Sequence, residues 1–367
     1  MDILVKGIAF GNTGYANATR GLIKCLRKLD TNLKLESLNA YKKDEDYHGL
    51  QDILNKKDVR PKISLQVTVP FQLQRLAHTY NIGYTMFEPT TLPASFRACL
   101  NNCDEIWVPS KQNRESFSKC CDKPVFHVPL PIDTNKFTPH LTKLNIVNDN
   151  RFKFLSLGTW GFRKGWHLLI PAFLEEFINN EAILLIIINN GEYKTILSEI
   201  RRFRKASGKY DLPDIIYINQ EISEDLLPYL YKEADVGVFP NLGEGLGLPL
   251  LEMMSVGKPV ITSNGSAMLD YCNDENAFMI EVEHDKFIKD RYGMNSNYYD
   301  NLKWIEPKKY NIRHQMRKAF ETPDLSRKGC MARQNALRYS YDNIIKIIKT
   351  RLEDAHGRIR QKTDELG

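Results

Sequence analysis

The sequence lacks a long hydrophobic run, a secretory leader and a disulfide framework. Its longest apolar run, Ala182 to Ile188, is far too short to span a bilayer. The chain opens directly with the strand-like residues Ile3 to Val5 and not with a basic segment followed by an apolar leader. Its seven cysteines are odd in number, and their spacing fits neither paired disulfides nor a zinc site. These absences favour a cytoplasmic protein whose membrane contact, if any, is peripheral.

The charged residues form no continuous stripe of one sign. Lysine and arginine number 51 against 45 acidic residues, which gives a formal net charge of +6, but the two signs are interspersed. A nucleic-acid partner is therefore not expected. Basic clusters such as Arg201 to Lys205 suit a phosphate-bearing ligand, an acidic acceptor or a membrane surface, although a solvated helix face is the simpler explanation for one cluster.

The length and the pattern of the chain indicate two α/β domains. A chain of 367 residues exceeds the usual limit for a single core. Short apolar strands alternate with helical patterns, which is typical of parallel sheets covered by helices. Residues 140–151 are polar and follow a proline-punctuated stretch, as expected of a linker. We place the first domain at 1–143, the second at 144–343, and a C-terminal helix and tail at 344–367.

A glycine-rich turn between two buried strands is the most informative stretch. Residues 238–261 read V-F-P-N-L-G-E-G-L-G-L-P-L-L-E-M-M-S-V-G-K-P-V-I, which predicts a strand end, a loop, a helix beginning at Pro249 and another strand. Glu244 and Glu252 bracket the turn and can point at different parts of one ligand. Alternatively, Glu252 only complements the helix dipole and Glu244 is solvated. Anions and sugar hydroxyls bind well to amides at a helix N-terminus, here those of Gly245, Leu246, Gly247 and Leu248.

This stretch resembles the E-x7-E signature of retaining glycosyltransferases of family 4, which have the GT-B fold. The residues that carry the likeness are E-G-L-G-L-P-L-L-E and the following S-V-G-K-P-V-I. The resemblance implies two Rossmann-like domains that face a central cleft, with the last helix crossing back to the first domain and a charged tail from Ala355. It also implies that Glu244, with the amides of residues 245–247, holds a donor sugar, and that Glu252 binds the ribose of its nucleotide.

Two further stretches are similar to the same family. G-N-T-G-Y, residues 11–15, follows a strand and opens a helix, but it lacks the third glycine of a dinucleotide-binding motif. In the family the amides of this loop, here Gly14 and Tyr15, approach the donor phosphates. The family holds the nucleotide base through the main chain before a later helix, which makes Glu221 and Ile222 candidates. A main-chain contact does not reveal which base is bound.

Two cations stand at the start of a helix in the second domain. The segment T-W-G-F-R-K-G-W, from Thr159 to Trp166, follows a strand. Arg163 and Lys164 would neutralise a departing diphosphate, whose charge is the largest electrostatic demand of sugar transfer, and Lys164 matches the family's R-K-G motif. Thr159-Trp160 departs from the family, where many members carry an arginine. Either Arg163 supplies that charge or the phosphate site is weaker than usual in the family. Alternatively, Arg163 and Lys164 are only charged residues on the surface.

An acidic residue ends a strand in the first domain. Glu88 follows Y-N-I-G-Y-T-M-F, and a nearby D-E-I-W-V-P-S, residues 104–110, also resembles the family's acceptor-side domain. Ligands bind at the carboxyl ends of strands in open α/β sheets. Glu88 is therefore a candidate for contacting the acceptor or acting as a base. Equally, it can cap a neighbouring loop.

The resemblance implies a retaining transferase that moves a sugar from a UDP- or GDP-sugar to a glycan, lipid or protein-linked acceptor. We find no well-placed nucleophile for double displacement, so a front-face reaction is expected. No metal or other cofactor is expected, because Asp44-Glu45-Asp46 lies in a charged connection and is a poor metal-site candidate. The alternatives are a same-fold epimerase or phosphorylase, and a catalytically silent nucleotide-sugar binder or scaffold.

Overall fold

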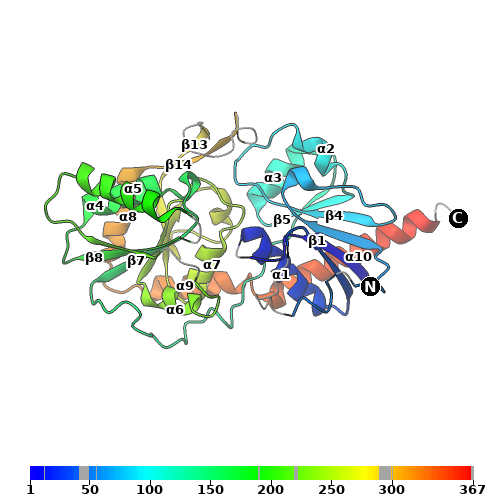
Figure 1. Cartoon of the computed structure of the whole chain (residues 1–367), viewed down its shortest axis with the longest axis horizontal. Coiled ribbons are helices and arrows are strands. Elements are labelled where there is room, and N and C mark those ends of the chain that lie inside the picture. Colours follow the sequence, from blue (N-terminus) through cyan, green and yellow to red (C-terminus); the bar gives the residue numbers. More distant parts are fainter. Residues whose placement is uncertain are drawn as a thin grey trace. The chain divides into compact units, whose positions relative to one another are not determined.

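The computed structural model describes residues 1–11, 13–40, 49–54, 56–188, 191–218, 222–288, 299 and 301–364. The chain forms two compact units, shown in Figure 1. Unit 1 contains residues 1–87, 92–132 and 339–367, and unit 2 contains residues 88–91 and 133–338. The short segment 88–91 thus clusters with unit 2, although unit 1 flanks it on both sides in the sequence.

Unit 1 is built on a six-stranded parallel sheet with the order β2-β1-β3-β4-β5-β6. The three central strands β3, β4 and β5 are buried along their whole length, as expected for a parallel sheet covered on both faces. The strands are β1 (Asp2–Gly7), β2 (Asn32–Ser37), β3 (Ile63–Val67), β4 (Tyr80–Tyr84), β5 (Glu105–Val108) and β6 (Val125–His127).

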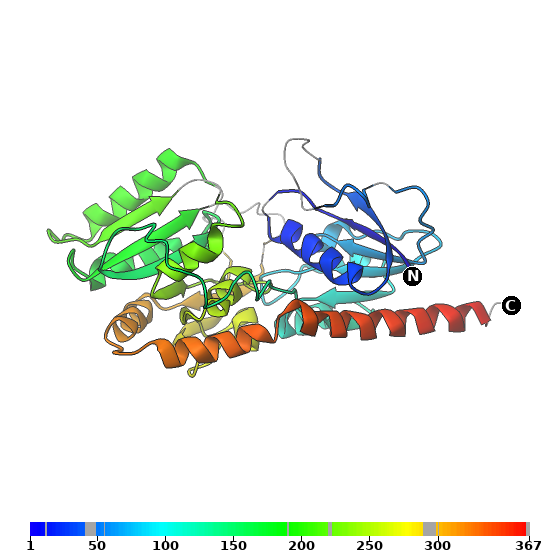
Figure 2. The same ribbon diagram turned by 90° about the horizontal axis from the view of Figure 1, so that it is seen from below.

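Among the described residues, unit 1 has the α-helices α1 (Gly14–Arg27), α2 (Phe96–Leu100), α3 (Lys111–Cys120) and α10 (Tyr341–Asp364). The side chain of Thr13 caps α1 by accepting a hydrogen bond from the amide of Ala16. The long helix α10 lies along unit 1 in Figure 2 and packs on α1. A charged tail from Ala355 was expected, but α10 continues to Asp364, because Ala355 is fully buried and Arg358 pairs with Glu105 of β5.

Unit 2 carries a second six-stranded parallel sheet, in the order β12-β11-β10-β7-β8-β9. The fully buried, seven-residue strand β8 lies next to the edge strand β9 and pairs with β7 over its whole length. The strands are β7 (Phe152–Gly158), β8 (Ala182–Ile188), β9 (Asp214–Ile218), β10 (Val236–Phe239), β11 (Val260–Ser263) and β12 (Ala277–Ile280).

The helices of unit 2 bury aromatic and aliphatic side chains against this sheet. Phe173 and Phe177, for example, pack on Phe154 of β7 with ring centroids 6.1 and 5.3 Å away. The helices are α4 (Trp166–Glu176), α5 (Tyr193–Ala206), α6 (Leu227–Glu233), α7 (Leu248–Ser255), α8 (Lys309–Phe320) and α9 (Ser326–Leu337). None of the described helices in either unit is long and apolar enough to cross a membrane.

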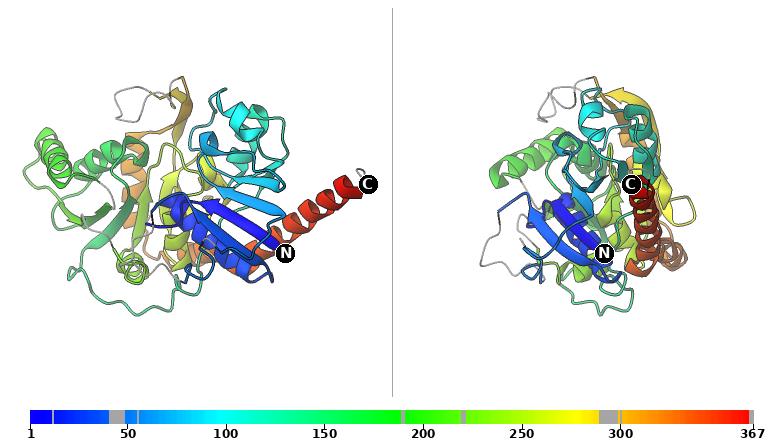
Figure 3. Two further views of the ribbon diagram at one scale, coloured as in Figure 1. Left: turned by 45° about the vertical axis from the view of Figure 1, so that its right-hand side comes forward. Right: turned by 90° about the vertical axis from the view of Figure 1, so that its right-hand side faces the viewer.

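An antiparallel hairpin of β13 (Val282–Phe287) and β14 (Lys303–Pro307) projects from the main sheet of unit 2, as Figures 1 and 3 show. The sequence had no clear periodicity here, and the hairpin was not predicted. The side chain of Trp304 is buried, and the amide of Ile305 donates to the carbonyl of Leu242 at 3.2 Å. The hairpin is therefore anchored on the loop that precedes Glu244.

The boundary between the two units differs from the one predicted at residue 143. Residues 133–143 were assigned to the first domain, whereas they cluster with unit 2. The hydroxyl of Ser255 donates to the carbonyl of Phe137 at 2.6 Å, and Lys136 pairs with Asp225 at 3.0 Å. Likewise, α10 begins at Tyr341 and unit 1 resumes at Tyr339, a few residues before the expected start at residue 344.

Candidate functional site

The candidate site in unit 2 lies where the order of the strands changes direction. β7 and β10 are neighbours in the sheet although two strands separate them in the sequence. In such sheets a ligand crevice opens at the carboxyl ends of these two strands. The loop after β7 carries Arg163 and Lys164, and the loop after β10 carries Glu244. Parallel pairing therefore brings together residues that are 80 positions apart in the chain.

Four charged side chains form one cluster at this point. Arg163 lies between two carboxylates: its guanidinium is 3.0 Å from Oε1 of Glu244 and 3.4 Å from Oε1 of Glu88. The Nζ of Lys164 contacts the same Oε1 of Glu244. The structure thus brings together all four residues that the sequence proposed for chemistry. Each side chain is partly or largely buried, with exposed fractions of 24% for Glu88 and 8% for Glu244.

Burial and pairing oppose each other in this cluster. Burial would raise the pKa of Glu244, but Lys164 and Arg163 outweigh it and hold that pKa below the ordinary value. Burial lowers the pKa of Lys164, with Glu244 acting against it. Burial also opposes the charge of Arg163, yet Glu244 and Glu88 raise its pKa above the ordinary value. Glu244 is therefore held as a carboxylate between two cations.

Glycines shape the two loops that carry the cluster. Gly165 has φ +76°, and a side chain there would meet the carbonyl oxygen of Pro240 at 2.2 Å. A Cβ at Gly243 would lie 2.6 Å from the carbonyl oxygen of Glu88. The absence of side chains at these positions lets the three segments approach closely. The amide of Leu242 then donates to the carbonyl of Arg163 at 2.8 Å, and Arg163 Nη1 donates to the carbonyl of Gly243 at 2.8 Å.

The E-x7-E helix α7 begins one residue earlier than predicted, at Leu248, because Gly247 adopts φ +87° and acts as its N-cap. Leu248 is half-buried, whereas Gly245, Leu246 and Gly247 are buried. Tyr271 donates its hydroxyl to the carbonyl of Leu246 at 2.6 Å. Ser266 accepts from the amide of Glu244 at 3.1 Å and donates to its carbonyl at 3.2 Å.

Glu252 lies on α7 beside an apolar core and a buried phenol. Tyr231 donates its hydroxyl to Oε2 of Glu252 at 2.8 Å. Burial raises the pKa of Glu252 to about 7, with the Tyr231 hydrogen bond acting against that rise. Glu224 and Lys136 also act on this carboxyl electrostatically. Glu224 follows the half-buried Ile222 in the turn before α6, while Glu221 lies outside the described residues.

The candidates in unit 1 lie at the start of α1. Gly14 is its first residue, and the hydroxyl of Tyr15 bonds to the main chain of Met86, donating to the carbonyl at 2.8 Å and accepting from the amide at 3.1 Å. The buried Arg20 donates to the carbonyls of Ala9 at 2.9 Å and Gly11 at 2.8 Å. Arg20 thereby holds the glycine turn, a role that sequence reasoning missed.

Thr159-Trp160, where many family members carry an arginine, is part of an aromatic cluster. Trp160 stacks on Trp166 with centroids 5.8 Å apart, and Trp166 Nε1 donates to the carbonyl of Thr159 at 2.8 Å. A second stack joins Phe162 to His167, 3.5 Å away, and to Trp304 of the hairpin, 6.0 Å away. Burial lowers the pKa of His167 to about 4, so this imidazole is neutral near pH 7.

Sequence reasoning missed Ser266, Tyr271, Tyr231 and Arg20. The first two are 22 and 25 residues from their partners, and Tyr231 is 21 residues from Glu252. No local periodicity marks such contacts. The polar stretch T-S-N-G-S at residues 262–266 is the one local signal that could have pointed toward Ser266. Asp44-Glu45-Asp46 lies outside the described residues.

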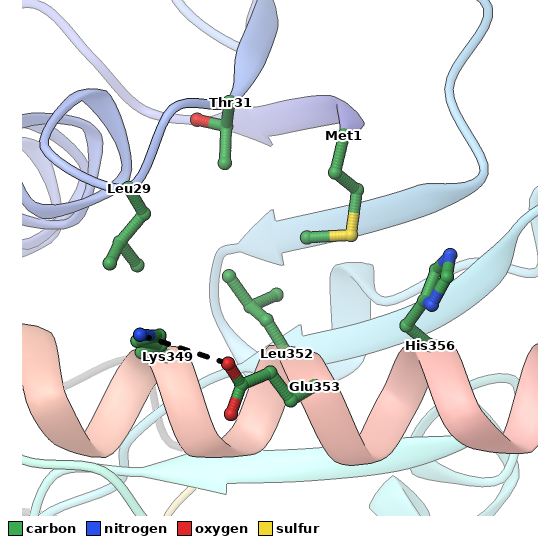
Figure 4. A pocket seen from close by; sticks show the side chains of 7 residues that line it. All are labelled: Met1, Leu29, Thr31, Lys349, Leu352, Glu353 and His356. Carbon is green, nitrogen blue, oxygen red and sulfur yellow. Dashed lines mark ion pairs between the residues drawn. The ribbon is translucent and has the colours of Figure 1, made fainter.

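A cavity of about 250 Å³ in unit 1 lies elsewhere. As Figure 4 shows, it is bounded by Met1, Leu29 and Thr31 on one side and by α10 on the other. Met1 precedes β1, and Thr31 precedes β2. The cavity is therefore at the amino ends of these strands, whereas the glycine turn of residues 11–15 follows the carboxyl end of β1.

Comparison with known proteins gives a family match over the part of the chain that holds Arg163, Lys164 and Glu244. Residues 141–292 match the family model described as glycosyl transferases group 1. O-antigen chain mannosyltransferase B of Escherichia coli is 45% identical over 60 residues, 16% of each chain. The UDP-Gal:alpha-D-GlcNAc-diphosphoundecaprenol alpha-1,3-galactosyltransferase of Escherichia coli is 28% identical over 185 residues, 44% of this chain and 42% of its own length. The chain spans between 16% and 51% of the length of the curated relatives it matches.

The fold is similar over the whole chain to that of a solved protein. The structure of HepE from Anabaena in complex with UDP and glucose matches with a TM-score of 0.72 at 12% identity, covering 96% of this chain and 100% of that one. At this identity the match speaks for the fold alone. The chain therefore has the GT-B fold, and its residues 141–292 match the model of the glycosyl transferases group 1 family.

Proposed function

We propose that the protein is a glycosyltransferase that moves a sugar from a nucleoside diphosphate sugar to a glycan, lipid or protein-linked acceptor. The observation that carries the proposal is the contact of Arg163 and Lys164 with Glu244, at the switch point of a sheet and beside the N-terminus of α7. Such a donor needs a carboxylate that accepts hydrogen bonds from the sugar hydroxyls. It also needs cations that bind the phosphates.

The names of similar proteins support the same class of reaction. One relative is named for transfer of galactose from UDP-Gal to a diphosphoundecaprenol-linked sugar. Another is the alpha-monoglucosyldiacylglycerol synthase of Streptococcus pneumoniae. HepE was solved with UDP and glucose. We therefore favour a UDP- or GDP-sugar donor, with the acceptor among glycans and lipids.

In the proposed complex each candidate residue has one task. Arg163 and Lys164 stabilise the leaving diphosphate, and Glu244, with the amides of residues 245–248, orients the sugar. Glu252 accepts hydrogen bonds from the ribose through the oxygen that Tyr231 does not use. Glu88 faces the acceptor. The amides of Gly14 and Tyr15 approach the phosphates, and the main chain at Ile222 holds the base.

We propose a retaining, front-face reaction that needs no metal. Double displacement requires a free carboxylate close to the sugar carbon. Glu244 is a poor nucleophile because both cations contact its Oε1 and hold it as a paired anion. A phosphate oxygen of the leaving group then takes the acceptor proton, while Arg163 and Lys164 supply the positive charge that a metal would otherwise provide.

The first test measures donor binding. The thermal midpoint should rise with UDP or GDP and their sugars but not with ADP, and magnesium should leave the rise unchanged. A ligand present at a hundred times its Kd adds about 2.7 kcal/mol of stability. Glu252→Ala should weaken binding of that nucleoside diphosphate about tenfold, since the ribose loses a hydrogen-bond acceptor.

Slow hydrolysis of the donor without an acceptor distinguishes an enzyme from the alternative, a silent nucleotide-sugar binder. Binding without hydrolysis or transfer would favour the binder. A folded protein that binds none of these nucleotides would overturn the proposed function, and unchanged affinity in Glu252→Ala would overturn the ribose assignment alone.

A further inference from the structure

The charge cluster of unit 2 is electrically balanced before any donor arrives. Arg163 and Lys164 contribute two positive charges, and Glu88 and Glu244 contribute two negative ones. A diphosphate brings further negative charge to cations that already have partners. The phosphates therefore compete with the two carboxylates for the donors of Arg163 and Lys164.

The two carboxylates differ in how firmly they are held. Glu244 has both cations on one oxygen, an exposed fraction of 8%, and a main chain that Ser266 bonds from both sides. The side chain of Glu88 is 24% exposed and its oxygen is 3.4 Å from Arg163. An ion pair that is longer and more exposed to water is weaker, so a phosphate oxygen exchanges for it more easily. Glu88 is thus the carboxylate that a phosphate oxygen can replace.

Although the side-chain contact is weak, main-chain hydrogen bonds hold Glu88 near Arg163. Thr90 donates its amide to the carbonyl of Lys303 at 2.7 Å, and the amide of Lys303 donates to the hydroxyl of Thr91 at 3.2 Å. The close approach of Gly243 to the carbonyl of Glu88 adds a second anchor. Because β14 holds this segment, the carboxylate stays at a high local concentration near the guanidinium.

We propose that Glu88 is a built-in counter-anion of Arg163, which a donor phosphate displaces, so that Glu88 sets the affinity for the donor and becomes free to face the acceptor only when the donor is bound. This inference rests on the proposed function, because it assumes that the ligand of Arg163 is a diphosphate. It assigns Glu88 a task in donor binding as well as at the acceptor.

The test compares Glu88→Gln with the wild type by titration calorimetry, with UDP, GDP and inorganic pyrophosphate as probes. Glutamine keeps the shape but removes the competing charge. Binding of the diphosphates should tighten about 3- to 10-fold, and the gain should shrink at high salt. Uridine and guanosine carry no phosphate, so their affinities should not change. Glu88→Asp, which keeps the charge, should bind the diphosphates no more tightly than the wild type.

Glu199→Gln is the matched control, because Glu199 pairs with Arg202 at 2.5 Å in the same unit. It should leave every affinity unchanged. Equal or weaker diphosphate binding by a folded Glu88→Gln protein would overturn the inference, and so would a parallel change in nucleoside binding. A wild-type protein that binds neither UDP, GDP nor pyrophosphate would instead overturn the proposed function, and the inference with it.

Discussion

Each unit holds a buried carboxylate that two cations share. In unit 1, Glu105 of β5 is fully buried and accepts from Arg351 at 3.1 Å and Arg358 at 2.8 Å. In unit 2, Glu244 is shared by Arg163 and Lys164. The charges are alike, but their surroundings differ.

The difference lies in how completely each carboxylate is satisfied. Glu105 also accepts from the hydroxyl of Tyr80 at 3.0 Å and from Trp107 Nε1 at 2.6 Å, and the guanidinium of Arg351 lies 3.3 Å from the ring centroid of Phe126. Both of its oxygens are in use. Glu244, by contrast, has both cations on Oε1. A saturated cluster fastens α10 to β5, whereas an unsaturated one is suited to binding.

The largest expected effect is on stability, at Glu105. Glu105→Ala leaves Arg351 and Arg358 without their counter-charge and should lower the free energy of unfolding by about 3 to 5 kcal/mol. Urea unfolding followed by circular dichroism measures this. Glu353→Ala is the matched control, because Glu353 pairs on α10 with Lys349 at 3.9 Å and is 65% exposed. A Glu105→Ala protein as stable as the control would refute the contrast.

At Glu244 the expected loss is in turnover. Glu244→Ala should lower sugar transfer by roughly 100- to 1000-fold, since the donor sugar loses its charged acceptor and the cations lose their alignment. Nucleoside diphosphate affinity should stay largely intact. Unfolding should be affected less than by Glu105→Ala, because Arg163 keeps Glu88 and the carbonyl of Gly243 as partners. Initial rates of transfer and denaturant titrations measure the two effects. Wild-type turnover in this variant would place the chemistry elsewhere.

A third carboxylate, Glu252, accepts a hydrogen bond from the phenol of Tyr231, and it should make stability depend on pH. Its pKa is about 7 in the folded protein against an ordinary value of 4.5, so the folded state binds the proton more tightly. The free energy of unfolding should therefore fall as pH rises from about 4.5 through 7, by up to about 3 kcal/mol. Glu252→Gln should show a flatter profile over this range. Identical profiles for the two proteins would mean that Glu252 does not titrate there.

Much of the fold followed from local patterns in the sequence. Apolar runs such as Ala182 to Ile188 predicted buried parallel strands, and β8 occupies this range. The hairpin β13–β14 could not be predicted in this way, since residues 283–310 show no period and their anchors are Leu242 and the segment 88–91. The extension of α10 was missed for a similar reason: its anchor, the pair of Arg358 and Glu105, joins residues 253 positions apart.

In the candidate site, too, local motifs could be predicted from the sequence, whereas long-range contacts could not. The glycine turn and the two cations are short motifs, and the sequence placed Glu244, Arg163 and Lys164 on loops at strand ends, where they lie. The meeting of Glu88 with Arg163 depends on hydrogen bonds between Thr90 and Lys303, which are 213 residues apart. Tertiary contacts of this kind leave no periodic trace. The roles of these residues in a reaction stay predictions.

The membership of residues 88–91 in unit 2 bears on how such a protein can be taken apart or recombined. A fragment of residues 133–338 would contain Arg163, Lys164 and Glu244 but neither Glu88 nor the partners of Lys303. Exchanging the first domain between two related chains would likewise replace four residues of the second unit. Neither unit can therefore be exchanged as one continuous segment of the sequence. A chimera that keeps the candidate site of its parent has to include residues 88–91 together with residues 133–338.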